Sequence, residues 1–244
     1  MNAKKRVAVL LSGRGTNMEA LLAAASAPEY PAEIVGVLSN NASALGLATA
    51  RARGIDAVCI PQKGFKTRSE HDAAVSEALS EFSPDIVCLA GYMRVLTADI
   101  VAAWAGRMIN IHPSLLPAFP GLDTHRRALE MGVRIHGCSV HFVTEKTDDG
   151  PIIAQAAVAV LPEDDAETLG QRVLTAEHRL YPMALSMQAM VDVIHGRGAA
   201  APDFARALAV ERIQEAIRIS SAERRWVRVA DIIRRATTVR HARE

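Results

Sequence analysis

Apolar and polar residues follow one another in blocks that predict strands and helices in alternation. Short runs of consecutive apolar residues, each ended by glycine or a polar residue, are typical of strands buried on both faces. Between these runs, apolar residues recur at the three-and-four spacing of an amphipathic helix. The predicted strands cover residues 7–11, 34–38, 57–60, 85–90, 108–111, 139–144 and 151–160, and the predicted helices about 18–25, 45–53, 67–82, 97–104, 124–131 and 166–194.

This alternation predicts an α/β fold, in which helices cover both faces of a mostly parallel, twisted sheet. Only a polar turn separates the last two predicted strands, so we expect them to form a late β-hairpin. A long C-terminal helix over residues 166–194 follows, and Gly196 ends it. Prolines hold the segment 115–122 as a loop.

The composition of the chain argues against several classes of function. The chain has 244 residues, half of them hydrophobic, which is enough for a sizeable core. Lys and Arg number 28 against 27 Asp and Glu, and only 4% of residues are aromatic, so nucleic-acid binding is not expected. No apolar stretch is long enough to cross a membrane. The three cysteines are far apart and form no cluster with histidines, which predicts a reducing cytoplasm and no metal site.

A glycine-containing turn is the first candidate site. Ligands of open α/β sheets bind beyond the carboxyl ends of the strands, and Gly13, Gly15, Thr16 and Asn17 lie at such an end. Glycines let the backbone approach an anion, and the start of a helix offers free N–H groups. The turn lacks the Gly-Lys-Ser/Thr of a P-loop, and Met18 stands where a dinucleotide fingerprint needs glycine. It is either a phosphate site or a tight turn.

Asn110, His112 and Asp148 are the second candidate site. Asn110 and His112 are two residues apart on a predicted strand, so their side chains point the same way. An amide beside an imidazole can hold a carbonyl oxygen and move a proton. Asp148 lies in the polar turn of the hairpin, where it either serves the turn or pairs with His112 and favours its imidazolium form. On the pattern alone, His112 can equally be a structural residue.

Six segments, taken together, resemble a known enzyme family. Alone, His136, His141 and Glu177 have the character of structural residues. In combination the segments resemble the phosphoribosylglycinamide formyltransferases, folate-dependent enzymes of purine synthesis, over about residues 6–197. The segments are SGRGTN (12–17), LAGYMR (89–94), NIHPSLLP (110–117), HGCSVH (136–141), DDGPII (148–153) and EHRLYP (177–182).

The resemblance implies a fold and a reaction. The fold is the Rossmann-like formyltransferase fold. The reaction transfers the formyl group of 10-formyltetrahydrofolate, the co-substrate, to the amine of 5′-phosphoribosylglycinamide in de novo purine biosynthesis, with no metal. Asn110 and protonated His112 stabilise the oxyanion of a tetrahedral intermediate, and Asp148 tunes His112.

The resemblance also implies two binding regions. Gly15, Thr16 and Asn17 match the loop that holds the acceptor's phosphate through backbone N–H groups, and Glu177 matches a carboxylate that contacts its ribosyl-glycinamide part. In the folate site backbone groups read the pteridine-like ring, and the turn over residues 145–148 closes on it. The residues that match the folate site are Arg68, Met93, Arg94, Val95, Leu96, Asn110, Val143, Thr144 and Glu145.

The C-terminal segment departs from this family. Residues 203–244 contain ten Arg and no Lys against six Asp and Glu, a net charge of about +4 (10 − 6). We therefore expect a formyltransferase catalytic domain over residues 1–198 and an arginine-rich helical appendage over residues 199–244. The appendage either packs on the enzyme or at a dimer contact, or it binds a partner such as RNA.

Three other functions share part of the evidence. Formyltetrahydrofolate deformylase has the same Asn/His/Asp trio, but it carries a regulatory domain before the first strand. Methionyl-tRNA formyltransferase usually lacks the glycine turn and has a larger basic C-terminal domain. A homologue that only binds folate has no need of the complete trio. We expect small-molecule substrates as partners and a monomer or homodimer.

Overall fold

The computed structural model describes residues 4–194 of the chain. The predicted appendage, residues 199–244, lies outside the described residues. Among the described helices, none is long and apolar enough to cross a membrane.

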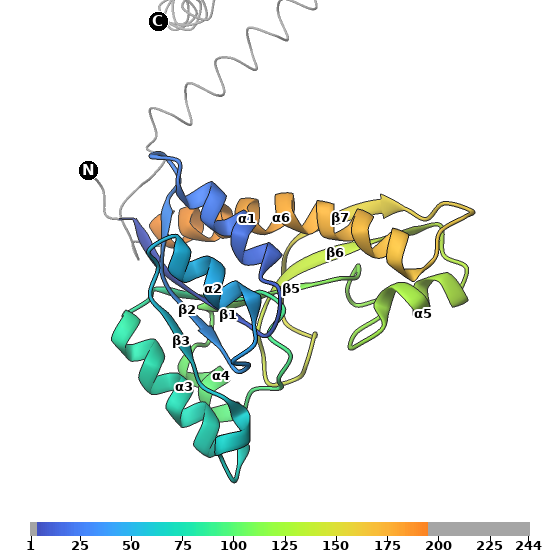
Figure 1. Ribbon diagram of the computed structural model, residues 1–244. Helices are drawn as coiled ribbons and strands as arrows, with labels where there is room; N and C mark the ends of the chain where they lie inside the picture. The colour runs from blue at the N-terminus through green and yellow to red at the C-terminus, as the bar shows by residue number, and fades with distance from the viewer. Residues whose placement is uncertain (1–3, 195–244) are drawn as a thin grey trace, which may run out of the picture.

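Seven strands form one sheet, in the order β3-β2-β1-β4-β5-β6-β7 (Figure 1). All neighbours pair in parallel except β6, which is antiparallel to both β5 and β7. The mostly parallel sheet and the late hairpin of β6 and β7 are therefore confirmed. The strands are β1 (Lys5–Leu11), β2 (Ala32–Ser39), β3 (Ala57–Cys59), β4 (Ile86–Leu89), β5 (Met108–His112), β6 (Ile135–Phe142) and β7 (Ile152–Ala159).

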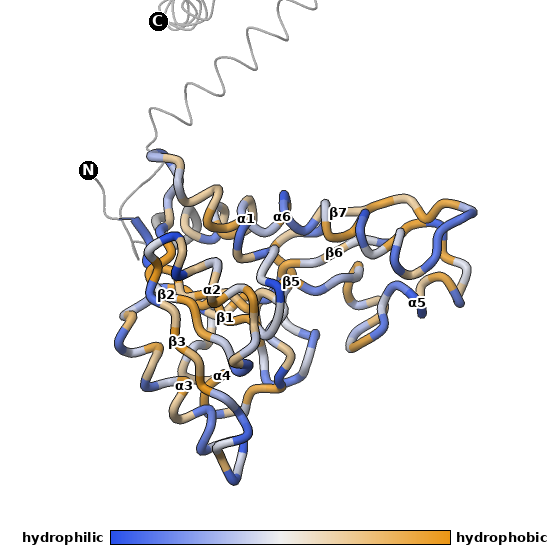
Figure 2. The backbone as a smooth tube through the Cα atoms, viewed as in Figure 1, coloured by the Kyte–Doolittle hydropathy of each residue, from blue (hydrophilic) through white to orange (hydrophobic). Residues whose placement is uncertain are grey.

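Helices cover both faces of the sheet. One core joins α1, α2 and α6 to one face, and a second core joins α3 and α4 to the other. The strands between them carry the most hydrophobic stretches of the chain (Figure 2). A short 3-10 turn, η1 (Gln62–Gly64), was not predicted, because three polar or small residues show no periodicity. The helices are α1 (Thr16–Ala25), α2 (Leu45–Ala52), α3 (Arg68–Phe82), α4 (Ala98–Ala103), α5 (Thr124–Glu130) and α6 (Ala166–Ile194).

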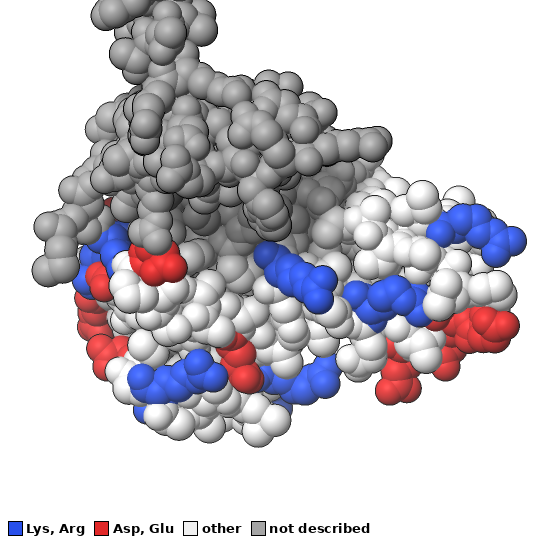
Figure 3. Space-filling model, turned by 90° about the horizontal axis from the view of Figure 1, so that it is seen from above, with Lys and Arg blue, Asp and Glu red and all other residues white. Residues whose placement is uncertain are grey.

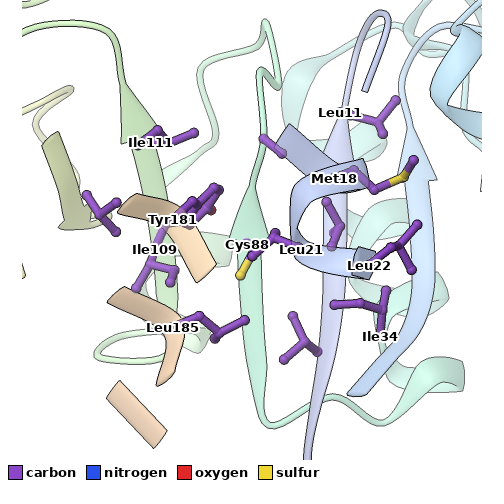
Figure 4. Close-up of a cluster of buried hydrophobic side chains, with 14 of the residues drawn as sticks. Leu11, Met18, Leu21, Leu22, Ile34, Cys88, Ile109, Ile111, Tyr181 and Leu185 are labelled. Carbon is purple, nitrogen blue, oxygen red and sulfur yellow. The ribbon is translucent and has the colours of Figure 1, made fainter. Parts of the chain in front are cut away.

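The long helix α6 is fixed to the centre of the sheet by a buried tyrosine. The Tyr181 hydroxyl lies 3.0 Å from the carbonyl oxygen of Leu89 on β4 and 3.2 Å from that of Ile109 on β5. Figure 4 shows Tyr181 and Leu185 over β5, beside the apolar residues of α1. This contact sets where the preceding turn of α6, which carries Glu177, meets the ends of the strands.

Most boundaries lie within two residues of the prediction, and the largest difference is at the start of β6. Strand β6 begins at Ile135, not at residue 139, because His136 and Gly137 continue the ladder opposite β7. Glycine is uncommon in strands, so the sequence of this segment did not predict that the strand begins before residue 139. A Cβ atom on Gly137 would lie 2.0 Å from the carbonyl oxygen of Ala156, so glycine is required where these strands meet.

Charged side chains of both signs occur on the described surface. On the face seen in Figure 3, basic and acidic side chains lie among uncharged ones.

Candidate active site

A cavity of about 800 Å³ opens at the carboxyl ends of β4 and β5. The strand order reverses at β1 and β4, and open α/β sheets bind ligands at such a switch point. Twelve predicted site residues from five segments line it: Asn17, Met93, Arg94, Val95, Leu96, Asn110, His112, Val143, Thr144, Glu145, Asp148 and Glu177.

His112 and Asp148 face each other in the lining of this cavity. His112 is 5% exposed, and its Nδ1 lies 3.5 Å from Asp148 Oδ1. Its Nε2 lies 3.1 Å from the carbonyl oxygen of Phe119. The second oxygen of Asp148 accepts the N–H of Gly121 at 2.8 Å. The pairing of His112 with the turn carboxylate, left open by the sequence pattern, is thus present in the structure.

Asn110 is oriented by His141, directly opposite it in the β5–β6 ladder. The His141 ring lies 2.9 Å from the Phe142 carbonyl oxygen through Nδ1, which fixes the proton on that nitrogen. Its Nε2, 3.2 Å away, then accepts one N–H of the Asn110 amide. Burial lowers the pKa of His141, which keeps this neutral tautomer, although Phe142 and Asp148 oppose the shift. Among the described residues, His141 is the hydrogen-bond partner found for this amide nitrogen.

The start of α1 and the side of α6 form one end of the cavity. Gly15, with φ 82°, precedes α1, and no side chain caps the helix. The first N–H groups of a helix have no intrahelical partner, so these backbone donors are available to an anion. The amide of Asn17 donates to Glu177 Oε2 at 2.6 Å, whereas its buried Oδ1 has no hydrogen-bond partner among the described residues. Burial raises the pKa of Glu177, and the bond from Asn17 opposes this.

The segment from Met93 to Leu96 forms another wall of the cavity. The backbone N–H of Met93 is held by Ser12 Oγ at 2.8 Å, and Arg94 Nη1 lies 3.0 Å from Gln62 Oε1. Met93 and Val95 are 68% and 53% exposed, so this wall offers apolar surface together with backbone groups. Val143, Thr144 and Glu145 line the same cavity from the loop after β6.

Three predicted residues do not line the cavity. Gly15 and Thr16 adjoin Asn17 at the start of α1. Arg68 is the first residue of α3 and is exposed. Its role in folate binding stays a prediction.

Two supporting features escaped the sequence analysis. Asp72 on α3 is 2% exposed and accepts the N–H of Thr97 at 2.7 Å, just beyond the Met93–Leu96 wall. A signal was available, because Asp72 shares the helical spacing of the core residues Val75 and Leu79. The loop of residues 118–123 and the start of α5 also reach the site, and Gly121 to His125 line it. The sequence of this loop shows only the proline and glycine residues of a turn, which did not indicate a role in the site.

Among the described residues, no group of three His, Cys, Asp or Glu side chains is arranged to hold a metal ion. The amide of Asn110, the imidazole of His112 and the carboxylate of Asp148 all line the same cavity.

Comparison with known proteins gives consistent relatives. Residues 5–185 match the family model described as formyl transferase. Phosphoribosylglycinamide formyltransferase of Escherichia coli (strain K12) is 43% identical over 180 residues, 74% of this chain and 85% of that protein. The trifunctional purine biosynthetic protein adenosine-3 of Gallus gallus is 50% identical over 186 residues, 76% of this chain. This chain spans only 18% of the length of that larger protein.

Solved structures agree with these relatives. Phosphoribosylglycinamide formyltransferase from Brucella melitensis has a TM-score of 0.74 and 56% identity, covering 77% of this chain and 96% of that chain. Glycinamide ribonucleotide transformylase 1 from Symbiobacterium toebii has a TM-score of 0.75 and 47% identity, covering 76% and 88%. With the family match spanning most of the sheet and its helices, the chain belongs to the formyl transferase family.

Proposed function

We propose that this protein transfers the formyl group of 10-formyltetrahydrofolate to the amine of 5′-phosphoribosylglycinamide, a step of de novo purine biosynthesis. The observation that carries the proposal is the position of Asn110, His112 and Asp148. They line one cavity together with Asn17 at the free start of α1 and with the Met93–Leu96 wall. Two substrates bound at the two ends would bring amine and formyl group together at this point.

The residues in the middle suit acyl transfer. The amine attacks the formyl carbon, a C–N bond forms, and the carbonyl oxygen becomes an oxyanion. The free N–H of Asn110 and a ring N–H of His112 stabilise that charge, and removal of one such donor typically costs ~3–4 kcal/mol of barrier. The tetrahedral intermediate then breaks its bond to the folate nitrogen. A proton leaves the amine and one reaches that nitrogen, and the paired His112 and Asp148 are placed to hold it.

His112 must exchange one contact to act. Its Nδ1 faces Asp148, and its Nε2 faces the Phe119 carbonyl oxygen. A substrate oxygen that takes the place of the Phe119 oxygen accepts the same N–H, so no new orientation of the ring is needed.

The two ends of the cavity suit the two substrates. The backbone N–H groups of Gly15, Thr16 and Asn17 bind the acceptor's phosphate, where the helix dipole also favours negative charge. Glu177 accepts hydrogen bonds from the ribosyl-glycinamide part. The folate ring lies against Met93–Leu96 and the Val143–Glu145 segment, and Arg68 at the start of α3 meets the folate from outside the cavity.

We assign catalysis to residues 1–198, because every residue that lines the cavity lies at or before Glu177. Residues 199–244 are the appendage. We further infer a cytoplasmic enzyme that needs no metal and acts as a monomer or homodimer. The three free cysteines, two of them buried, support a reducing compartment.

A steady-state assay tests the function. The full chain is supplied with 10-formyl-5,8-dideazafolate, with and without the ribonucleotide acceptor, and release of the deformylated folate is followed. Release that depends on the acceptor supports the transferase. Release without acceptor would instead identify a deformylase, an alternative that no observation here favours. No release in either case would contradict both.

A further inference from the structure

We propose that Arg127, on α5, is a positioning residue for His112 and Asp148. It acts through the loop of residues 118–123, whose backbone contacts both of these side chains. The inference rests on the proposed function of the two side chains, and it adds a residue outside the cavity to their machinery.

The loop holds the catalytic pair from two sides. The carbonyl oxygen of Phe119 lies 3.1 Å from His112 Nε2, and the N–H of Gly121 donates to Asp148 Oδ2 at 2.8 Å. The two contacts are only two residues apart on the chain. A shift of the loop therefore moves the carboxylate and the imidazole relative to each other in the substrate-free site. When a substrate oxygen replaces that of Phe119, the loop still positions Asp148 through Gly121, and Asp148 faces His112.

The loop backbone needs external support. Phe119 and Asp123 have φ values of 54° and 56°, in the left-handed region that side chains other than glycine seldom adopt. Gly121, between them, has φ 79°. Residues in such conformations persist only where the surrounding structure imposes them. The contacts that impose this shape are therefore part of the site.

Arg127 provides such contacts to the middle of the loop. Its Nη1 donates to the carbonyl oxygens of Pro120 at 2.5 Å and of Leu122 at 3.3 Å. These two carbonyls flank Gly121. The guanidinium carbon also lies 5.8 Å from the centre of the Phe119 ring, within range of a cation–π contact. A second anchor, Ser114 Oγ, donates to the Ala118 carbonyl oxygen at 2.6 Å and fixes the start of the loop.

Arg127 itself does not line the cavity, so it acts through the loop and not on a substrate. Within the part of the chain that the structure describes, Arg127 makes no hydrogen bond or ion pair with the proposed phosphate-binding start of α1 or with the Met93–Leu96 wall. Loss of Arg127 should therefore reduce the turnover number and leave both KM values nearly unchanged.

The test compares three variants of the full chain. Arg127→Met keeps the apolar stem and removes the donors, Arg127→Lys restores a cationic donor, and Glu130→Gln is the control at an exposed position on the same helix. Glu130 pairs with the side chain of Arg126 and, among the described residues, contacts no part of the 118–123 loop. We expect kcat to fall about tenfold or more in Arg127→Met, because small displacements of reacting groups have effects of this size. Arg127→Lys should recover part of the loss, and Glu130→Gln should behave as wild type.

The melting temperature and both KM values are measured for each variant. Wild-type kcat in Arg127→Met would overturn the inference, and so would a rise in either KM that accounts for the whole loss of activity. A loss that Arg127→Lys does not relieve, and that Glu130→Gln shares, would indicate a merely structural role for α5. Absence of acceptor-dependent turnover in the wild type would count against the proposed function, whereas an active wild type with an unaffected Arg127→Met would count against Arg127 alone.

Discussion

At the scale of single residues, the site keeps a buried carboxylate that destabilises the fold. Glu177 is 6% exposed, and its side chain is hydrogen-bonded to Asn17. Burial raises its pKa above the usual 4.5. A carboxyl group whose pKa is higher in the folded state binds its proton more tightly there. Folding therefore becomes less favourable once the pH exceeds the pKa of this group in the unfolded chain. The proposed contact with the acceptor explains why an acid is kept at this position.

Glu177→Gln is expected to increase the free energy of unfolding at neutral and alkaline pH and to raise the KM for the acceptor. The amide still accepts the bond from Asn17 but carries no charge. As the pH rises from the unfolded to the folded pKa, the wild type loses stability and the variant does not. Denaturant unfolding between about pH 4 and pH 8 should show a difference that grows and then levels off. A difference that is constant with pH would contradict this account.

At the scale of elements, α3 acts as a brace between two loops that follow strands. The His71 ring nitrogen Nε2 lies 2.9 Å from the carbonyl oxygen of Ile60, just after β3. The adjacent Asp72 accepts the N–H of Thr97 at the start of α4 and lies 3.6 Å from Arg94 Nε. Asp72 of α3 thereby holds the Met93–Leu96 wall in place through Thr97 and Arg94.

Asp72→Asn should raise the KM for the formyl donor by about three- to tenfold, with the acceptor KM unchanged. Asparagine can still accept the Thr97 N–H, but it loses the charge that faces Arg94. Steady-state kinetics with each substrate varied in turn checks this result. Glu81→Gln, an exposed position on the same helix, serves as the control. Equal effects on both KM values would show that Asp72 supports the fold in general and not this wall.

Helix α5 and strand β6 meet at two histidines. His125 Nδ1 lies 3.2 Å from His136 Nε2, and His136 is 1% exposed. The pKa of His136 is lowered to about 4. Burial is the largest cause and the neighbouring His125 the second. His112 also lowers this pKa, whereas a hydrogen bond with the Pro113 backbone raises it. This buried ring therefore resists protonation in the folded state.

Acid should weaken this junction. The folded pKa of His136 lies below its unfolded value, so the unfolded state takes up the proton first and stability is lost as the pH falls from about 6.5 towards 4. In His136→Gln this part of the loss should be absent. Urea unfolding followed by circular dichroism across that range gives the comparison. Parallel pH dependences for wild type and variant would refute the assignment.

At the scale of the whole molecule, most of the fold was predictable from local pattern. The buried strands are continuous apolar runs, and their alternation with helices predicts a mostly parallel sheet. The start of β6 was missed because Gly137 is required by the close approach of Ala156, about nineteen positions further along the chain (156 − 137). Such requirements come from strand pairing and leave no local periodicity.

Site residues were predictable from the sequence where they lie on the same strand. Asn110 and His112 share a strand, and the two-residue period places both in the cavity. Asp148 needed the hairpin to fold back before its pairing with His112 was evident. The loop of residues 118–123 and Asp72 act through backbone contacts between distant segments, which residue type alone does not reveal.

The central claim is that His112 carries formyl transfer in this cavity. The most direct measurement compares full-length wild type and His112→Ala for acceptor-dependent release of deformylated folate, together with donor binding by fluorescence titration. We predict that turnover falls by about a hundredfold or more while the donor Kd stays within about twofold, since the imidazole acts on the transition state. Wild-type turnover in His112→Ala would contradict the account.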